Sequence, residues 1–293
     1  MTAPAVSLKS LTKLYPVPLR RERLVAVRDL SLEIPEGEVF GLLGPNGSGK
    51  STTLKMLLGL ATPTSGTAHV FGHESGGFAA RSEVGFLPEN PYFYKFLTGG
   101  ETLAFYGKLC GLKGKALRDR TNDLLELVGL KEARDRRVGG YSKGMLQRIG
   151  LAQAIIQQPR LVVLDEPTAG VDPAGSRQIR DLILTLKERG TTVLLTSHLL
   201  EQVQDVCDRV GIMARGQLVR LGPLEELVSV DNQTQFIVEN ADPALSKKIE
   251  TLIQESGSGA TLLETRHPQR SLEKVFLEVT GNHEPAPQRT TPQ

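Results

Sequence analysis

The sequence has few cysteines, little net charge and no long hydrophobic run. Its 293 residues contain only two cysteines, Cys110 and Cys207, whose wide separation is typical of reduced thiols rather than a disulfide framework. The formal net charge of +2 argues neither for nor against contact with nucleic acid or a membrane. No apolar stretch approaches the roughly 20 residues of a membrane-spanning helix, and the opening MTAPAVSLKS lacks the pattern of a secretory signal. We therefore expect a cytosolic protein with room for one large domain and one small one.

The most informative segment is GLLGPNGSGKST, at residues 41–52. A predicted buried strand ends there in a glycine-rich loop, and a helix is expected from Lys50 to Leu60. Four residues match the phosphate-loop pattern G-x-x-x-x-G-K-[ST], namely Gly44, Gly49, Lys50 and Ser51. Glycines let backbone N–H groups and a helix N-terminus approach an anion without an intervening side chain. We expect Lys50 to reach the β- and γ-phosphates of a nucleoside triphosphate, and the Ser51 hydroxyl to hold Mg²⁺.

Two adjacent carboxylates, Asp165 and Glu166, follow four apolar residues in LVVLDE. A continuous apolar run predicts a central parallel strand, and open α/β sheets bind ligands at the carboxyl ends of such strands. Asp165 is expected to bind Mg²⁺, directly or through water, and Glu166 to polarise the attacking water as a general base. His198 follows another predicted core strand, where its imidazole could bond the γ-phosphate or that water.

The sections around these motifs predict an α/β protein. Apolar and polar residues alternate between 6 and 34, which indicates antiparallel strands. The pattern then becomes helical, with helices expected at 101–109, 117–128 and 145–158. Strands and helices alternate beyond this block, which is typical of a parallel or mixed sheet. The expected strands are 161–164, 191–196 and 210–214, and the expected helices are 176–189 and 199–207.

The carboxyl-terminal part predicts a small separate unit. Its expected strands are 235–238 and 260–264, and its expected helices are 243–254 and 272–279. The last residues, GNHEPAPQRTTPQ, have no apolar periodicity. We divide the chain into a main domain at 1–228 with a helical subdomain at about 88–159, an accessory unit at 229–280 and a disordered tail at 281–293.

In their order along the chain, these motifs resemble those of the ATP-binding subunits of ABC transporters. The phosphate loop GPNGSGKST comes first, followed by LVVLDEPTAGVDP and TSH, and between them YSKGMLQRIGLAQA resembles the family's signature motif. The resemblance covers about residues 6–221. It implies a P-loop NTPase fold of the ABC type, with a mixed sheet, an antiparallel β section and a helical subdomain, to which a small α+β extension is added. It also implies ATP and Mg²⁺ as ligands.

The resemblance further implies roles for individual residues. Tyr15 would stack on adenine, and the phosphates would be surrounded by the whole loop. That loop comprises Gly44, Pro45, Asn46, Gly47, Ser48, Gly49, Lys50, Ser51 and Thr52. Ser142 and Gly144 would touch a γ-phosphate held by the other protomer, and Asp172 would lie in a loop that joins two protomers. One chain carries one copy of each motif, so two composite sites would need a second copy or a homologous ATPase subunit.

The sequence departs from most of the family at four positions. Tyr141, Lys143 and Met145 stand where most members have the Leu, first Gly and Gln of LSGGQ. Glu89, in GFLPEN, stands where most have a glutamine, and it is a further candidate for contacting nucleotide and metal. Together with the ending SLEKVFLEVT, these features resemble the drug-, sodium- and copper-associated exporters whose ATPase and membrane parts are separate polypeptides.

We therefore expect an ATP-hydrolysing subunit that powers transport, in the direction of export, through a separate transmembrane permease at the cytoplasmic face of a membrane. The alternative hypothesis is a soluble ABC ATPase that acts on ribosomes or DNA without transport. Such proteins usually join two cassettes or carry a long coiled-coil insert, so we expect no nucleic-acid partner. A regulatory subunit without turnover is a second alternative, which is disfavoured because Lys50, Asp165, Glu166 and His198 are all present.

Overall fold

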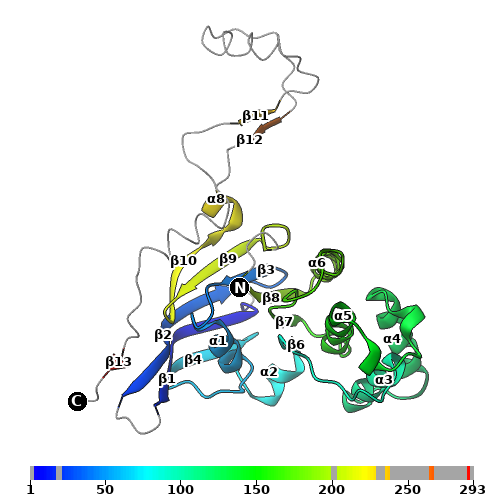
Figure 1. Ribbon diagram of the computed structural model, residues 1–293. Coiled ribbons are helices and arrows are strands. Elements are labelled where there is room, and N and C mark those ends of the chain that lie inside the picture. Colours follow the sequence, from blue (N-terminus) through cyan, green and yellow to red (C-terminus); the bar gives the residue numbers. More distant parts are fainter. Residues whose placement is uncertain are drawn as a thin grey trace, which may run out of the picture.

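The computed structural model describes residues 3–17, 22–198 and 203–228, together with the backbone of three short strands further along the chain. This part of the chain contains two main sheets, with a helical block to one side (Figure 1). In the described residues, no helix combines the length and the apolar character that crossing a membrane requires.

The first sheet is antiparallel throughout and begins the chain, as the alternating pattern predicted. In spatial order its strands are β13 (Arg289–Thr290), β2 (Arg23–Ile34), β1 (Val6–Pro16), β4 (Ser65–Val70) and β5 (His73–Glu74). Strand β2 is continuous, but its register against β1 is irregular. Asp29 has a left-handed φ of 46°, which is how one strand absorbs the break in the pattern.

The second sheet carries the chemistry-bearing motifs at the ends of its strands. In spatial order its strands are β10 (Gln217–Pro223), β9 (Arg209–Ala214), β3 (Val39–Leu43), β8 (Thr192–Ser197), β7 (Leu161–Asp165) and β6 (Val84–Leu87). All neighbouring pairs are parallel except β9 and β10. The mixed sheet predicted from the alternation of strands and helices is therefore confirmed.

Both faces of this second sheet are covered, which explains the continuous apolar runs. Successive side chains of a strand point to opposite faces. In β3, Val39 and Leu43 enter the core that is shared with the helical block and α6, whereas Phe40 and Leu42 enter a second core facing the antiparallel sheet. A strand buried on both sides has no polar face, so its sequence reads as an uninterrupted apolar run.

The helices fill the space between the sheets and form the side block. They are α1 (Lys50–Leu57), α2 (Phe78–Ser82), α3 (Gly99–Leu109), α4 (Gly114–Leu127), α5 (Lys143–Ala154), α6 (Pro173–Glu188) and α8 (Leu224–Val228), with 3₁₀ turns at Lys131–Ala133 and Val138–Gly140. Helix α1 places Leu54 and Met56 in the core beneath the antiparallel sheet. Helices α3, α4 and α5 form the predicted helical block, seen in green at the right of Figure 1.

Helix ends differ from the predictions for identifiable reasons. Helix α5 begins at Lys143 rather than 145, because the Ser142 side chain accepts a hydrogen bond from a backbone N–H of its first turn. It ends at Ala154 rather than 158, and Gln158 itself has a left-handed φ of 56°. Helix α6 begins three residues earlier than predicted, because Asp172 caps it and proline occupies its first position.

Strand β10 was not predicted. It forms a hairpin with β9 through Arg215 and Gly216, whose φ values of 51° and 78° are both left-handed, as in a type I′ turn. The usual sequence signal for this turn is Asn-Gly or Asp-Gly, and arginine conceals it. Leu224 of α8 is buried in the core that the second sheet shares with the helical block and α6.

Little of the expected carboxyl-terminal unit lies within the described residues. Strands β11 (Gln235–Ile237) and β12 (Glu264–Arg266) pair antiparallel, close to the two strands expected there. Two residues of the expected tail, Arg289–Thr290, pair with β2. The expected helices at 243–254 and 272–279, and the start of the helix expected at 199–207, lie outside the described residues, so the domain boundaries stay predictions.

Candidate functional site

The glycine-rich loop connects β3 to α1 and turns the N-terminus of α1 toward a cleft. Gly49 caps α1 with a left-handed φ of 109°. A Cβ atom at this position would lie 2.6 Å from the carbonyl oxygen of Ala26, so only glycine fits here. The first turn of α1 contains no acidic residue. The exposed N–H groups and the positive end of the helix dipole therefore favour an anion in the cleft.

The cleft has a volume of about 320 Å³. Most of the predicted site residues line it, although they come from distant parts of the sequence. The lining comprises Tyr15, Leu24, Val25, Ala26, Pro45, Asn46, Gly47, Ser48, Gly49, Lys50, Ser51, Thr52, Glu89, Glu166 and His198. The single chain thus brings the phosphate loop together with the predicted base, histidine and adenine-stacking tyrosine.

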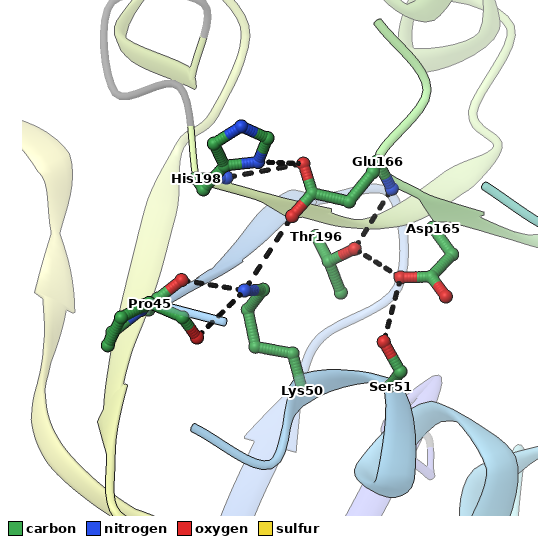
Figure 2. Close-up of polar contacts among 8 residues, drawn as sticks. Pro45, Lys50, Ser51, Asp165, Glu166, Thr196 and His198 are labelled. Carbon is green, nitrogen blue, oxygen red and sulfur yellow. Dashed lines mark hydrogen bonds and ion pairs between the residues drawn. The ribbon is translucent and has the colours of Figure 1, made fainter. Parts of the chain in front are cut away.

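Lys50 lies at the centre of the polar contacts (Figure 2). Its Nζ donates hydrogen bonds to the carbonyl oxygens of Gly44, at 2.6 Å, and Pro45, at 3.4 Å. It also lies 3.6 Å from Oε1 of Glu166. Only 5% of Lys50 is exposed, and a buried ammonium group needs such partners. Lys50 therefore links the phosphate loop to the carboxylate at the end of β7.

Asp165 and Ser51 lie side by side. The Ser51 hydroxyl donates to Oδ1 of Asp165 at 3.4 Å, and the Thr196 hydroxyl donates to the same oxygen at 2.7 Å. Oδ2 of Asp165 stands outside this network (Figure 2). A hydroxyl and a carboxylate are hard oxygen ligands of the kind that Mg²⁺ prefers, so the donor set fits this metal.

Glu166 is held by both its backbone and its carboxylate. Its φ of 50° lies in the left-handed region, which is costly for a residue with a side chain. Its N–H donates to Oγ1 of Thr196 at 3.0 Å. Oε2 lies 2.7 Å from Nδ1 of His198 and also accepts from the His198 backbone N–H at 3.3 Å. With Lys50 at the other oxygen, the carboxylate is oriented from two sides (Figure 2).

Tyr15 and Glu89 lie on the lining of the cleft, as the resemblance implied. Nζ of Lys13 lies 5.0 Å from the centre of the Tyr15 ring, so this ring already carries a cation on one face. The backbone carbonyl of Glu89 accepts a hydrogen bond from Nε2 of Gln147 at 2.8 Å. Gln147 belongs to α5, so Glu89 connects the cleft to the signature helix.

Five predicted site residues do not line the cleft: Gly44, Ser142, Gly144, Asp165 and Asp172. Gly44 and Asp165 bond to Lys50 and Ser51 of the lining, whereas the other three lie apart from it. Ser142 caps α5 and is exposed, and Asp172 caps α6 by accepting from the Gly175 N–H at 2.7 Å. Gly144 approaches Val171 in the loop that precedes α6. The structure therefore separates a phosphate-loop half, built around the cleft, from a signature half, formed by the starts of α5 and α6.

The three residues of the signature motif that differ from most of the family each make a contact of their own. Tyr141 is 8% exposed, and its hydroxyl donates to the Ala133 carbonyl at 2.7 Å, so it anchors the loop before α5 to the helical block. Burial raises the pKa of this phenol. Nζ of Lys143 lies 2.5 Å from where a Cβ of Gly170 would be, so this lysine crosses the loop before α6. Met145 packs partly buried against the core.

Sequence reasoning missed two residues of this region, Thr196 and Gln147. Both are buried, at 0% and 1% exposure, and both bond to predicted site residues. A threonine within an apolar strand and a glutamine within a helix carry no motif signal. Pairing of β7 with β8 places Thr196 opposite Asp165, so only knowledge of this register would have found it.

Comparison with known proteins gives consistent results. The model of the ABC transporter family matches residues 27–169. An uncharacterised ABC transporter ATP-binding protein of Nostoc sp. is 43% identical over 229 residues, covering 78% of this chain and 68% of the relative. The daunorubicin/doxorubicin resistance ATP-binding protein of Streptomyces peucetius is 37% identical, covering 91% of this chain and 90% of the relative. The linearmycin resistance ATP-binding protein of Bacillus subtilis is 34% identical, covering 88% and 86% respectively.

A solved structure also resembles the fold. A dimeric ATP-binding cassette in a post-hydrolysis state, bound to ADP and phosphate, is 26% identical and superimposes with a TM-score of 0.68. The match covers 75% of this chain and 98% of that one.

Proposed function

The chain belongs to the ABC transporter family of ATP-binding proteins, and we propose that its cleft is one half of an ATP site in which Glu166 activates the attacking water. As a member of this family the chain is the ATP-hydrolysing subunit of a transporter. The observation that carries the residue assignment is the position of the Glu166 carboxylate, which is held between Lys50 and His198 at the carboxyl end of β7.

Binding of the triphosphate uses the loop and Lys50. The phosphates enter the cleft at the N-terminus of α1, where backbone N–H groups and the helix dipole stabilise their charge. Lys50 exchanges its carbonyl partners, on Gly44 and Pro45, for phosphate oxygens, since its ammonium already points along the loop. Tyr15 stacks on adenine at the rim of the cleft.

Hydrolysis uses the carboxylates and His198. Ser51 and Asp165 would hold Mg²⁺, with Glu89 as a further candidate, and the bound metal would supply positive charge against the phosphates. Glu166 accepts a proton from the water that attacks the γ-phosphate. His198 orients the Glu166 carboxylate through the 2.7 Å contact, and we assign it a contact with the γ-phosphate as well.

The active unit is a dimer with two composite sites. Ser142 is exposed at the start of α5, and it does not line the cleft of its own chain. Its helix N-terminus is suited to a phosphate group, as that of α1 is. We assign Ser142 and Gly144 to the γ-phosphate bound by the partner protomer, and Asp172 to the contact between protomers. The dimeric state of the solved cassette supports this assignment.

The chain acts with a separate transmembrane permease on the cytoplasmic face of a membrane. A groove of about 450 Å³ lies between β6 and the helical block, and its lining includes Pro91, Tyr92, Phe93 and Tyr106. Tyr92 is 82% exposed, so an aromatic side chain at this groove is accessible to a partner. A short helix of the permease fits this groove. The two similar drug-resistance proteins support export as the direction of transport.

Replacing Glu166 by glutamine tests the assignment of the base. Glu166→Gln keeps the shape of the side chain but replaces one acceptor oxygen by an amide group and removes the basicity. We expect ATP to bind with unchanged affinity, turnover to fall roughly a hundredfold or more, and ATP with Mg²⁺ to trap a dimer. Calorimetry, phosphate release and light scattering measure these quantities.

Glu188→Gln is the matched control, because Glu188 is an exposed glutamate at the end of α6, away from the cleft. It should retain the turnover of the unmodified protein. Unchanged turnover in Glu166→Gln would refute the assignment of the base. If Glu166→Gln binds ATP but keeps the mass of a monomer, the composite site is wrong.

A further inference from the structure

Thr196 joins the Asp165 carboxylate to the backbone of Glu166 through one hydroxyl group. Its Oγ1 donates to Oδ1 of Asp165 at 2.7 Å and accepts from the N–H of Glu166 at 3.0 Å. The residue is 0% exposed. Burying a hydroxyl without hydrogen bonds is costly, whereas here the group is used both as donor and as acceptor. The contacts tie the last residue of β7 and the residue that follows it to a single atom of β8 (Figure 2).

The acceptor role follows from the backbone of Glu166. The parallel ladder between β7 and β8 ends at the pair of Asp165 and Thr196. Glu166 then turns into the left-handed region, with a φ of 50°, so its N–H leaves the ladder. A buried N–H without an acceptor would be destabilising. The Thr196 hydroxyl provides that acceptor and so stabilises the turn that points the Glu166 side chain toward Lys50 and His198.

The donor role concerns Asp165. With Thr196 and Ser51 both on Oδ1, the carboxylate plane is set, and Oδ2 stands outside the network. Partners that orient a metal-binding side chain commonly affect metal affinity or activity about 10- to 100-fold. The same hydroxyl thus controls the rotamer of the metal-binding carboxylate and the backbone of the base.

We propose that Thr196 is a positioning residue, which fixes Asp165 and Glu166 relative to each other so that metal and attacking water are aligned. This inference rests on the proposed function, because it takes Asp165 as a metal ligand and Glu166 as the base. Thr196 itself does not line the cleft, so it acts through these two residues.

Thr196→Val tests the proposal, because valine has nearly the same shape and lacks the hydroxyl. We expect kcat to fall roughly 10- to 100-fold with KM for ATP changed less than about threefold. We also expect the affinity of the ATP-bound protein for Mn²⁺, measured by electron paramagnetic resonance, to fall about tenfold. Thr196→Ser restores the hydroxyl and should return both quantities to within about threefold of the unmodified protein.

Thr192→Val is the matched control on the same strand. Thr192 is also 0% exposed, and its hydroxyl accepts from the Gly37 N–H at 2.9 Å, at the opposite end of β8. This variant loses a buried hydroxyl but should keep kcat and Mn²⁺ affinity. If it loses them as Thr196→Val does, the effect is one of general stability and the proposal is overturned.

A pair of smaller side chains covers the case in which Thr196→Val does not fold. Thr196→Ala and Thr196→Ser differ by the hydroxyl alone, and the serine variant should exceed the alanine variant at least about tenfold in kcat. Equal turnover of these two variants overturns the proposal. Normal turnover in Thr196→Val together with slow turnover in Glu166→Gln overturns only the role of Thr196, whereas normal turnover in both overturns the proposed base.

Discussion

The phosphate-loop half and the signature half of this protein are built differently. In the first half, Lys50 and Glu166 are buried, and hydrogen bonds connect them to the loop, to β8 and to His198. In the second half, Ser142 is exposed, and its side chain bonds only locally, to the Met145 N–H at 3.3 Å. A preorganised half can bind nucleotide by itself, whereas an open half depends on what another protomer brings to it.

The link between the halves is short. Nε2 of Gln147, on the signature helix, donates to the backbone carbonyl of Glu89, which lines the cleft. Oε1 of Gln147 is buried and has no hydrogen-bond partner in the described residues. Movement of the helical block relative to the sheet would therefore act on Glu89 directly. This hydrogen bond thus joins the signature helix to the lining of the cleft.

The largest expected effect is on the affinity for ATP, which should depend on the phosphate-loop half and not on the signature half. Lys50→Met removes a buried ammonium group and should weaken ATP binding by the isolated chain roughly a hundredfold. This is the loss of affinity expected when one or two charge-assisted hydrogen bonds to the phosphates are removed. Ser142→Ala should leave that affinity within about twofold, because no described contact joins Ser142 to the cleft. Calorimetry on each monomeric variant gives the comparison.

The same serine variant should fail in assembly. In the Glu166→Gln background, Ser142→Ala should raise the ATP concentration needed to form a dimer about tenfold, because one hydrogen bond to the γ-phosphate is lost. Equal loss of monomer affinity in Lys50→Met and Ser142→Ala would show that the two halves are not separate. Light scattering over a range of ATP concentrations measures the dimer.

A smaller effect concerns the electrostatics of Glu89. An ionised glutamate near Mg²⁺ adds attraction, but near phosphates without a metal it adds repulsion. Glu89→Gln should therefore narrow the affinity gap between Mg-ATP and metal-free ATP, by about three- to tenfold, while some hydrolysis is retained because Glu166 remains. Titrations with ATP in magnesium and in chelator give both affinities. An unchanged gap would leave contact with the permease as the role of Glu89.

The smallest effect concerns the two cysteines, which differ in burial. Cys207 is buried behind β3, where a Cβ of Gly41 would lie 3.0 Å from its Sγ, whereas Cys110 is exposed at the end of α3. Burial strongly raises the pKa of the Cys207 thiol, with the nearby charges of Asp208 and Glu38 adding to the effect. Above about pH 8.5 the unfolded chain releases this proton while the folded chain retains it, so the free energy of unfolding falls as pH rises.

Cys207→Ala should therefore remove part of the alkaline loss of stability, about 1.4 kcal/mol per pH unit above pH 8.5. Its free energy of unfolding at neutral pH should be lower, because a buried side chain is shortened. Cys110→Ala should change the slope much less, since this thiol is exposed. Urea unfolding between pH 7.5 and 10 measures how the free energy of unfolding of each variant depends on pH. An identical pH dependence in the two variants would contradict the difference in burial between the two thiols.

Local motifs were predicted well because their structure depends on neighbours in the sequence. Gly49 must be glycine where the loop enters α1, and the apolar run before Asp165 could only be a covered strand. Errors arose where a local feature was concealed. Arginine replaced the usual asparagine in the β9–β10 turn, and helix α5 was placed two residues late because the cap formed by Ser142 was overlooked.

The sequence by itself determined that this protein holds a nucleoside triphosphate, because the phosphate loop, the carboxylate pair and the histidine each belong to a short motif of adjacent residues. Only the tertiary structure decided how the pieces meet. Thr196 lies opposite Asp165 because β7 and β8 pair in one register, and Gln147 reaches Glu89 because α5 packs against β6. Buried polar groups must find partners wherever the packing places them, and such partners can be distant in the sequence.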